Sequence, residues 1–313
     1  MAKDEGKKRV VITGAMGNLG TKLTKHLKEK YEVVLIDLKL GTSLLEPITR
    51  LTNYFQGVDT VFHFAAKNPF PEATWEDSIC SMDMTANVFL AAIQMKVRRV
   101  VLASSNHVMG GLKEEGVNIH TAKPITSFSK PKPGTHLVYP LNSDSTPYAV
   151  AKLFGERLAY ALSHSPLNID TCFIALRIGW CMPKENQPKD SSPAGTVNPD
   201  TVGKIKSAVR GGKCTKTDPE QVTEWFQLMW LSNRDFLQIC EKVITADFSG
   251  KFHIFNAMSR NTGMRWDLAY PQRILGYNPK DDVTKHPRPN GDGKIGIYQS
   301  LTISRERRLK SKL

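Results

Sequence analysis

Short apolar runs alternate with amphipathic stretches along the first third of the chain. The apolar runs lie at residues 9–12, 32–36, 60–66 and 99–103. Between them, Leu23 and Leu27 mark the apolar face of an expected helix over 19–30, and a second helix is expected around 82–95. This alternation is typical of βαβ units with right-handed crossovers. It predicts an α/β fold built on a doubly wound parallel sheet.

The second half of the chain mixes regular and irregular segments. Residues 110–147 are rich in Pro, Gly, Ser and Lys, which predicts a long surface excursion. Residues 183–219 are polar and basic, which predicts an insertion near the substrate side. Regular structure is expected in the remaining segments, as a helix at 148–163, a strand at 171–178, a further stretch at 225–244 and a last strand at 251–256.

The composition is that of an ordinary globular protein, with 40% hydrophobic and 23% charged residues among 313. No apolar run reaches bilayer-spanning length, and the charged N-terminus lacks the apolar stretch of a secretory signal. The five cysteines are widely spaced, so we expect neither a disulfide framework nor a metal site. The net charge of +13 is dispersed, which favours a basic surface over nucleic-acid binding.

A glycine-rich loop joins the first expected strand to the first expected helix. The residues expected to face a cofactor there are Gly14, Gly17, Asn18, Leu19 and Gly20. Their spacing lets the backbone at a helix N-terminus approach a pyrophosphate, as in Rossmann nucleotide sites. Asp37 ends the next strand, where a carboxylate accepts hydrogen bonds from the adenosine ribose. It would repel the extra phosphate of NADP, so we predict NAD, although the nearby Lys39 softens that preference.

Tyr148 and Lys152 are four residues apart in an expected helix, so their side chains can act on the same ligand. Free tyrosine, with a pKa of about 10, is a poor base at neutral pH. We expect the Lys152 ammonium to lower the pKa of Tyr148, which makes proton transfer from a substrate hydroxyl feasible. Ser105 follows the fourth expected strand, at the carboxyl edge of the sheet, where it would hold the reacting oxygen.

Two histidines lie near these residues in the sequence or the expected sheet. His107 follows Ser105 closely and is compatible with either a substrate contact or a hydrogen-bonded loop histidine. His63 lies inside an apolar run, which favours a structural role.

Together these residues resemble the extended short-chain dehydrogenase/reductase family, also called the NAD-dependent epimerase/dehydratase family. The resemblance rests on the glycine loop, Asp37, the strand at 57–66, the turn at 104–107 and the YAVAK segment that begins at Tyr148. It implies an NAD-dependent enzyme in which Ser105, Tyr148 and Lys152 are catalytic and Lys152 also holds a cofactor ribose. It further implies cofactor contacts from Ala65 and Ile178, and a homodimer built through the helices at 82–95 and 148–163.

Within that family, segments 103–107, 176–183 and 230–236 are similar to bacterial uronate dehydrogenases. Those enzymes oxidise the anomeric carbon of a hexuronic acid with NAD. The resemblance implies that Tyr148 takes the hydroxyl proton of a sugar. The residues that it implies for orienting that sugar are Ser105, Asn106, His107 and Tyr148.

Several positions depart from the uronate dehydrogenase pattern. Trp225 and Phe226 stand where an arginine that clamps the sugar carboxylate is expected, and Trp180 stands where a small serine is expected. Ser81 replaces the first asparagine of a characteristic helix, whereas Asn87 matches the second. Basic residues of the insertion could supply another clamp or hold a phosphorylated sugar, although a solvated loop is favoured. They are Lys204, Lys206, Arg210, Lys213 and Lys216.

Three functions are compatible with these residues. The leading hypothesis is an NAD-dependent dehydrogenase acting on a sugar or sugar acid. The second is an epimerase or dehydratase that keeps its NAD bound, and the third is a non-catalytic NAD-binding sensor on the same fold. We expect an NAD-binding domain with the catalytic residues at 1–182, a substrate-binding insertion and lobe at 183–280, and a basic tail at 281–313.

The chain ends in Ser311-Lys312-Leu313, which has the form of a peroxisomal address. We expect a peroxisome or related organelle, and the peroxisomal import receptor as a partner, if the source is a eukaryote. In a prokaryote we expect the cytoplasm. The other expected partner is a small sugar substrate, with no nucleic acid and no membrane.

Overall fold

A computed structural model gives the arrangement of the chain. It describes residues 6–67, 74–114, 122–134, 136–137, 143–188 and 225–285. The C-terminal tripeptide Ser311–Leu313 and the basic residues between Lys204 and Lys216 lie outside the described residues.

Six strands form one parallel sheet, as the alternating pattern predicts. Across the sheet they are β2 (Glu32–Ile36), β1 (Arg9–Thr13), β3 (Val58–His63), β4 (Arg99–Ser105), β7 (Cys172–Ile178) and β8 (Phe252–Ala257). Every neighbouring pair is parallel. The chain places β2 on one side of β1 and β3 on the other, so the strand order reverses between β1 and β3. Ligands of such sheets bind at the carboxyl ends of the strands beside this reversal.

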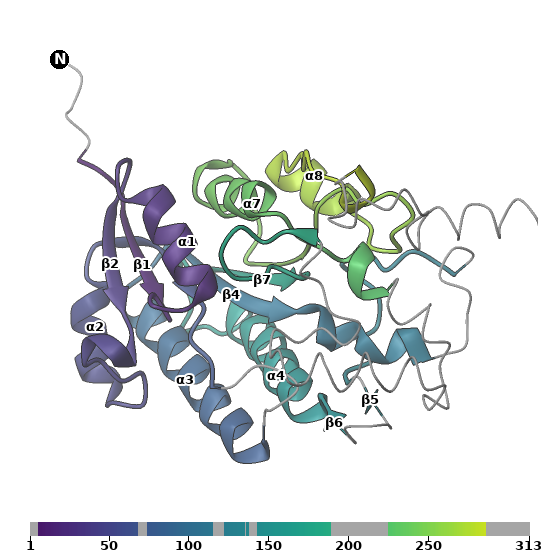
Figure 1. The fold of residues 1–313 in the computed structure, drawn as a ribbon. Coiled ribbons are helices and arrows are strands. Elements are labelled where there is room, and N and C mark those ends of the chain that lie inside the picture. Colours follow the sequence, from purple (N-terminus) through teal and green to yellow (C-terminus); the bar gives the residue numbers. More distant parts are fainter. Residues whose placement is uncertain are drawn as a thin grey trace, which may run out of the picture.

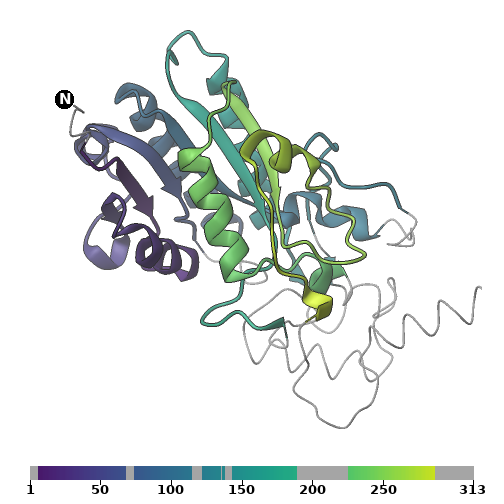
Figure 2. The ribbon, with the colours of Figure 1, turned by 90° about the horizontal axis from the view of Figure 1, so that it is seen from above.

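Helices cover both faces of the sheet (Figure 1). One layer holds α1 (Asn18–Leu27), α7 (Asn233–Thr245) and α8 (Ala269–Leu275), and the other holds α2 (Ile48–Phe55), α3 (Trp75–Gln94) and α4 (Thr146–Ser163). In the view from above, α7 lies along the sheet on the same face as α1 (Figure 2). The two helices touch, with His26 Nε2 and Glu241 Oε2 2.9 Å apart.

The strands bury side chains on both faces, which explains why the sequence shows continuous apolar runs. Val10 and Ile12 of β1 belong to the core beneath α1 and α7, which includes Leu23 of α1. Val11, between them, belongs to the core beneath α2, α3 and α4, which includes Phe89 of α3. Two separate cores therefore stabilise the sheet, and its carboxyl edge is left to form a site.

Several element boundaries differ from the sequence predictions. β4 runs to Ser105 rather than to 103, because its pairing with β7 continues through Ser104 and Ser105. α3 begins at Trp75 rather than at 82, because Thr74 caps it by accepting a hydrogen bond from Asp77 N at 3.1 Å. The pattern also does not predict the short helix α2.

Short elements occur within the segment that we predict as a surface excursion. They are the 3-10 helix η2 (Asn106–Glu114) and a hairpin of β5 (His136–Leu137) and β6 (Ser143–Asp144). Two more 3-10 helices follow β2 and close the described chain, η1 (Leu38–Leu40) and η4 (Val283–Lys285). The division into domains at 182 and 280 stays a prediction, because residues 189–224 and 286–313 lie outside the described ranges.

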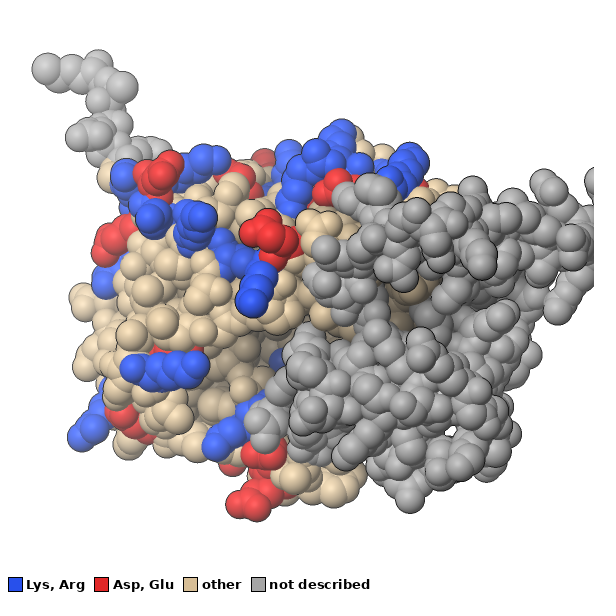
Figure 3. Space-filling view, viewed as in Figure 1, with Lys and Arg blue, Asp and Glu red and all other residues tan. Residues whose placement is uncertain are grey.

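The basic residues are spread over the surface. Figure 3 shows Lys and Arg in several separate groups on one face, with Asp and Glu among them. Some of these charges are paired, as in Lys30 with Glu241 and Arg234 with Asp281. None of the helices in the described ranges has the length and apolar character that crossing a membrane requires.

Candidate active site

A cavity of about 380 Å³ lies at the carboxyl ends of the central strands. Ligand sites usually have volumes of roughly 300–1,000 Å³. Most of the site residues predicted from the sequence line it, namely Gly14, Gly17, Asn18, Leu19, Gly20, Ser105, Asn106, His107, Tyr148, Lys152 and Ile178. Asp37 and Ala65 lie outside this lining, at the ends of β2 and β3. The structure therefore brings the two expected groups of residues, cofactor-binding and catalytic, to one place.

The glycine loop depends on its glycines for steric reasons. Gly14 has a φ of +68°, and a Cβ there would lie 2.6 Å from Ala65 N. A Cβ at Gly20 would lie 2.7 Å from Ala15 Cα and would also overlap Gly14 O. The absence of these Cβ atoms lets β1, the loop after β3 and α1 pack at close range.

The N-terminus of α1 opens onto the cavity. Gly17 caps the helix without a side-chain hydrogen bond, and the first turn has no acidic residue. The first N–H groups of a helix have no acceptor within the helix, and they attract anionic oxygens. The lining residues Gly17 to Gly20 therefore fit the pyrophosphate of a dinucleotide.

Asp37 is held in place by two backbone donors. Met16 N donates to its Oδ2 at 2.9 Å, and Lys39 N donates to its Oδ1 at 2.9 Å. The first contact ties the carboxylate to the glycine loop, and the second begins η1. A half-buried carboxylate at the end of β2 fits the hydroxyls of an adenosine ribose.

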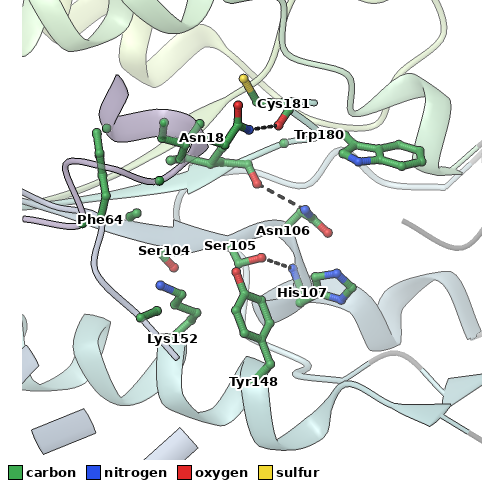
Figure 4. A pocket seen from close by; sticks show the side chains of 18 of the residues that line it. Asn18, Phe64, Ser104, Ser105, Asn106, His107, Tyr148, Lys152, Trp180 and Cys181 are labelled. Atoms are coloured by element: carbon green, nitrogen blue, oxygen red, sulfur yellow. Dashed lines mark hydrogen bonds between the residues drawn. The ribbon is translucent and has the colours of Figure 1, made fainter. Parts of the chain in front are cut away.

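Ser105, Tyr148 and Lys152 meet where β4 ends and α4 begins (Figure 4). The Tyr148 hydroxyl is hydrogen-bonded to Ser105. Lys152 Nζ lies 5.6 Å from the centroid of the Tyr148 ring. Because α4 begins at Thr146, Tyr148 lies in its first turn and Lys152 lies one turn later on the same face.

The prediction that Tyr148 has a lowered pKa is wrong for the unliganded protein. Burial raises the pKa of Tyr148 above its ordinary value, and the hydrogen bond with Ser105 opposes that rise only in part. The physical reason is that removing a phenolate from water destabilises it by more free energy than one hydrogen bond contributes to its stabilisation. The tyrosine is therefore a neutral phenol at physiological pH in this state.

Lys152 is a cation in a sheltered position. Burial lowers the pKa of Lys152 to about 8, and no carboxylate within the described residues offsets that effect. The ammonium is still charged at neutral pH, so it favours a ligand that brings acceptor oxygens into the cavity.

Asn106 and His107 line the cavity beside Ser105. His107 lies edge-on to Tyr148, with ring centroids 5.7 Å apart, and burial lowers the pKa of His107 to about 3, so its ring is neutral. Asn106 donates to Ile178 O at 3.2 Å, while its Oδ1 is buried without a partner among the described residues. That orphaned acceptor fits a ligand hydroxyl.

An aromatic wall, which consists of His107, Phe226 and Trp180, lies at one side of the site; His107 and Trp180 line the cavity, and the fully buried Phe226 packs against both. The ring centroids of His107 and Phe226 are 6.5 Å apart, and those of Phe226 and Trp180 are 5.9 Å apart. Among the described lining residues, the cationic side chains are Lys67 and Lys152. The arginine expected from the uronate dehydrogenase pattern has no counterpart in this part of the wall.

Polar side chains hold β3 and the loop that follows it. Lys67 N donates to Ser81 Oγ at 2.9 Å, so the serine that replaces a family asparagine positions this loop. His63 is structural, as expected, with Nδ1 2.8 Å from Thr13 Oγ1 and Nε2 3.0 Å from Thr85 Oγ1. Burial lowers the pKa of His63 to about 3, so it bridges β1 and α3 as a neutral ring.

A contact that the sequence analysis did not assign joins α1 to the segment after β7. Asn18 Nδ2 donates to Cys181 O at 2.8 Å. Lys22, one turn further along α1, donates to Met182 O and, at 2.6 Å, to Asn233 Oδ1 of α7. The helix that opens at the glycine loop therefore also fixes the strand end that carries Ile178 and Trp180.

A family model described as the NAD dependent epimerase/dehydratase family matches residues 10–179. The chain is 28% identical to the L-arabinose 1-dehydrogenase (NAD(P)(+)) of Haloferax volcanii, over 88% of this chain and 97% of the relative. It is 27% identical to the NAD-dependent glucose-6-phosphate dehydrogenase of the same organism, over 87% of this chain and 93% of the relative. A solved structure of a mutated uronate dehydrogenase has the same fold, with a TM-score of 0.62 and 22% identity over 96% of this chain and 99% of that chain.

Replacing Gly20 with alanine will weaken NAD binding. Alanine inside a helix is ordinarily favoured over glycine by about 1 kcal/mol. Here the new Cβ would lie 2.7 Å from Ala15 Cα, and overlap of this kind costs about 1–3 kcal/mol and displaces the loop. We expect the Kd for NAD, measured by calorimetry, to rise at least ~10-fold. Gly6→Ala is the control, because a Cβ there meets nothing within 4 Å. An unchanged Kd in Gly20→Ala would show that this loop does not hold the cofactor.

Replacing Lys152 with methionine will stabilise the unliganded protein at pH 7. Burial lowers the pKa of Lys152 from 10.5 to about 8, so the unfolded chain binds this proton more tightly than the folded chain does. The cost of the buried ammonium is complete below pH 8 and disappears as the pH rises towards 10.5. We expect the free energy of unfolding in urea to rise by about 1–3 kcal/mol at pH 7 and to change little near pH 11.

Arg157→Met is the matched control for that measurement, because Arg157 is an exposed cation on the same helix. It should change the free energy of unfolding by less than about 0.5 kcal/mol. A Lys152→Met protein that is less stable than the original at pH 7 would contradict the assignment of an unpaired buried ammonium.

Proposed function

This chain belongs to the NAD-dependent epimerase/dehydratase family, and we propose that it is a dehydrogenase that oxidises a hydroxyl group of a sugar or sugar acid. Its cofactor is NAD, as the family description states. The observation that carries the proposal is the placing of Ser105, Tyr148 and Lys152 in one cavity with the glycine loop. The relatives named for L-arabinose and glucose 6-phosphate oxidation support a sugar as the substrate.

The cofactor would be held by groups at the carboxyl ends of β1, β2, β3 and β7 and by one residue of α4. The N-terminus of α1 would bind the pyrophosphate, and Asp37 would bind the adenosine ribose. Lys152 would bind the other ribose, and Ala65 and Ile178 would lie beside the cofactor. Once bound, NAD accepts the hydride that the sugar carbon releases.

Tyr148 would remove the proton from the reacting hydroxyl while Ser105 holds the same oxygen. Tyr148 would act as the phenolate, after its own proton has passed to solvent. The C–H bond of the sugar carbon would then break with loss of its hydride, the O–H proton would pass to the phenolate oxygen, and a C=O bond would form. Because burial raises the pKa of Tyr148, this transfer depends on groups that favour the phenolate. Ser105 does so by hydrogen bonding, and the nearby Lys152 cation does so more strongly as water leaves the cavity.

The aromatic wall supports a neutral aldose more than a hexuronate. Aromatic rings pack against the C–H faces of a sugar ring, and the free Oδ1 of Asn106 accepts a sugar hydroxyl. Trp225 and Phe226 are buried at the position where a carboxylate-clamping arginine is expected. Among the described lining residues, the cations that could pair with a uronate carboxylate are Lys67 and Lys152.

The second candidate function is an epimerase or dehydratase that retains its NAD, which the family description includes. It would use the same Tyr148 and Ser105. The two functions differ in whether NADH accumulates, so one experiment separates them.

A homodimer is a further part of this proposal. Apolar side chains on the outer helix layer support it, with Trp75 and Ile79 of α3 each 54% exposed and Tyr160 of α4 50% exposed. Pairing of α3 and α4 with a second copy would cover them.

Tyr148→Phe will abolish most of the turnover without removing NAD binding. The purified protein is incubated with NAD and a panel of neutral aldoses, aldose phosphates and hexuronic acids, and NADH absorbance is followed. We expect NADH with at least one neutral aldose, and a fall in kcat of roughly 10²–10⁴-fold in the variant, because the base is lost. Tyr160→Phe is the control on the same helix, since its ring lies on the exposed side of α4 and contacts Phe252.

Equal turnover by Tyr148→Phe would contradict the assignment of the base. No NADH with any sugar, together with NAD that copurifies at one equivalent, would select the epimerase or dehydratase function instead. NADH formed with a hexuronate alone would contradict the preference for a neutral aldose.

A further inference from the structure

A buried ion pair lies directly behind the active site. Glu156 of α4 and Arg177 of β7 are each 1% exposed. Arg177 Nε donates to Glu156 Oε1 at 2.9 Å, and Arg177 Nη2 donates to Oε2 at 2.8 Å. Ser104 Oγ of β4 also donates to Oε1, at 2.6 Å. These three residues, the anchoring triad, tie one helix to two adjacent strands.

Ser104 of the anchoring triad lines the cavity, and both strand members of the triad lie next to other lining residues. Ser104 and Arg177 are register partners in the pairing of β4 with β7, and the next pair along is Ser105 with Ile178. Ser105 and Ile178 both line the cavity. Any movement of the triad relative to the sheet therefore moves the strand ends that carry the proposed site.

The helix member lies on the catalytic face of α4. Glu156 follows Lys152 by four residues and Tyr148 by eight, so the three side chains lie along one side of the helix. Gly155 lets that side approach the sheet closely, since a Cβ there would lie 2.6 Å from Leu102 Cδ2 of β4. The carboxylate of Glu156 therefore fixes where the face that carries Tyr148 meets the sheet.

Stability alone does not explain a charged pair at this position. Burial strips both ions of their hydration, and apolar residues of similar volume often replace such pairs without loss of stability. Arg177 Nη1 is also buried without a partner among the described residues, which adds to the cost. The pair instead provides geometric specificity, because a bidentate contact fixes both the distance and the orientation of its partners.

We propose that Glu156, held by Ser104 and Arg177, is a positioning residue that keeps Tyr148 and Lys152 of α4 in register with Ser105 of β4. This inference rests on the proposed function, because the residues positioned are the proposed catalytic ones. The hydrogen bond between Tyr148 and Ser105 spans the same helix and strand. A misplacement of about 1 Å in such a contact can cost ~10²-fold in rate.

Two variants separate positioning from stability. Glu156→Gln keeps the shape of the side chain but leaves the Arg177 charge unpaired. The double variant Glu156→Leu with Arg177→Met replaces both charges by apolar groups, so its unfolding temperature should lie close to that of the original protein. We expect kcat to remain at least ~10-fold lower in both variants, with the KM for the sugar and the Kd for NAD changed less than ~3-fold.

Asp59→Asn is the matched control. Asp59 also makes a bidentate contact, with Arg98 Nε and Nη2 each 2.7 Å from a carboxylate oxygen, but it lies near the start of β3, away from the cavity. Loss of the contact between Asp59 and Arg98 should lower the unfolding temperature without lowering kcat. Recovery of kcat together with stability in the double variant would overturn the proposal and leave the triad a purely structural feature.

A second readout does not depend on turnover. The Tyr148 pKa is followed by NMR of ¹³C-labelled tyrosine, with Tyr148→Phe to assign the signal. We expect the double variant, which leaves the net charge unchanged, to raise the Tyr148 pKa further, because the hydrogen bond with Ser105 that lowers it is weakened. If no sugar is oxidised but this shift occurs, the proposed function fails and the positioning inference stands. An unchanged Tyr148 pKa in the double variant overturns the inference whatever the substrate.

Discussion

The pairing of β4 with β7 is the contact on which the rest of the site depends. It continues through Ser104 with Arg177 and Ser105 with Ile178, beyond the point where the apolar run of β4 ends. This extension carries Ser105 to the carboxyl edge of the sheet, beside the reversal of strand order between β1 and β3. Parallel strands that end together bring residues far apart in the sequence to one edge, so a single cavity can hold both a cofactor loop and a proton-transfer group.

The site accepts electrostatic costs that a stable core would avoid. Among the described residues, the buried cation Lys152 has no carboxylate partner, and burial disfavours the phenolate of Tyr148. Two buried histidines lie nearby, His63 near Lys152 and His107 beside Tyr148, and burial keeps both neutral with pKa values of about 3. Because these histidines are neutral, Lys152 is the positive charge nearest to Tyr148 among the described lining residues. The cavity is therefore arranged for a ligand that completes it, at the expense of the unliganded state.

Local sequence patterns were sufficient to predict the sheet and the glycine loop. Alternating apolar runs depend on contacts that repeat along each strand, and the glycines depend on close backbone approach, so both leave a trace in short stretches of sequence. The buried triad and the contacts of Lys22 could not be predicted in this way, because their partners are 21 and more residues distant. A signal did exist for Arg177, which is a charge within an apolar strand. The pKa of Tyr148 was predicted with the wrong sign, because burial depends on packing that no local spacing reveals.

Some residues of the site lie inside the range that the family model matches and others lie outside it, and this difference bears on the identity of the substrate. The family model covers residues 10–179, which include the glycine loop, Ser105, Tyr148 and Lys152. Trp180 and Phe226 of the aromatic wall lie beyond that range, and Trp180, just after the end of β7, lines the cavity. The glycine loop and the proposed catalytic residues therefore lie inside the range that the family model matches, whereas two of the three residues of the wall lie outside it. Relatives named for a pentose and for a sugar phosphate match this chain at similar identities, 28% and 27%, so overall likeness does not choose between substrates. The choice rests on the few side chains that face the sugar, and in this chain those described combine the rings of His107 and Trp180 with the polar groups of Ser105 and Asn106.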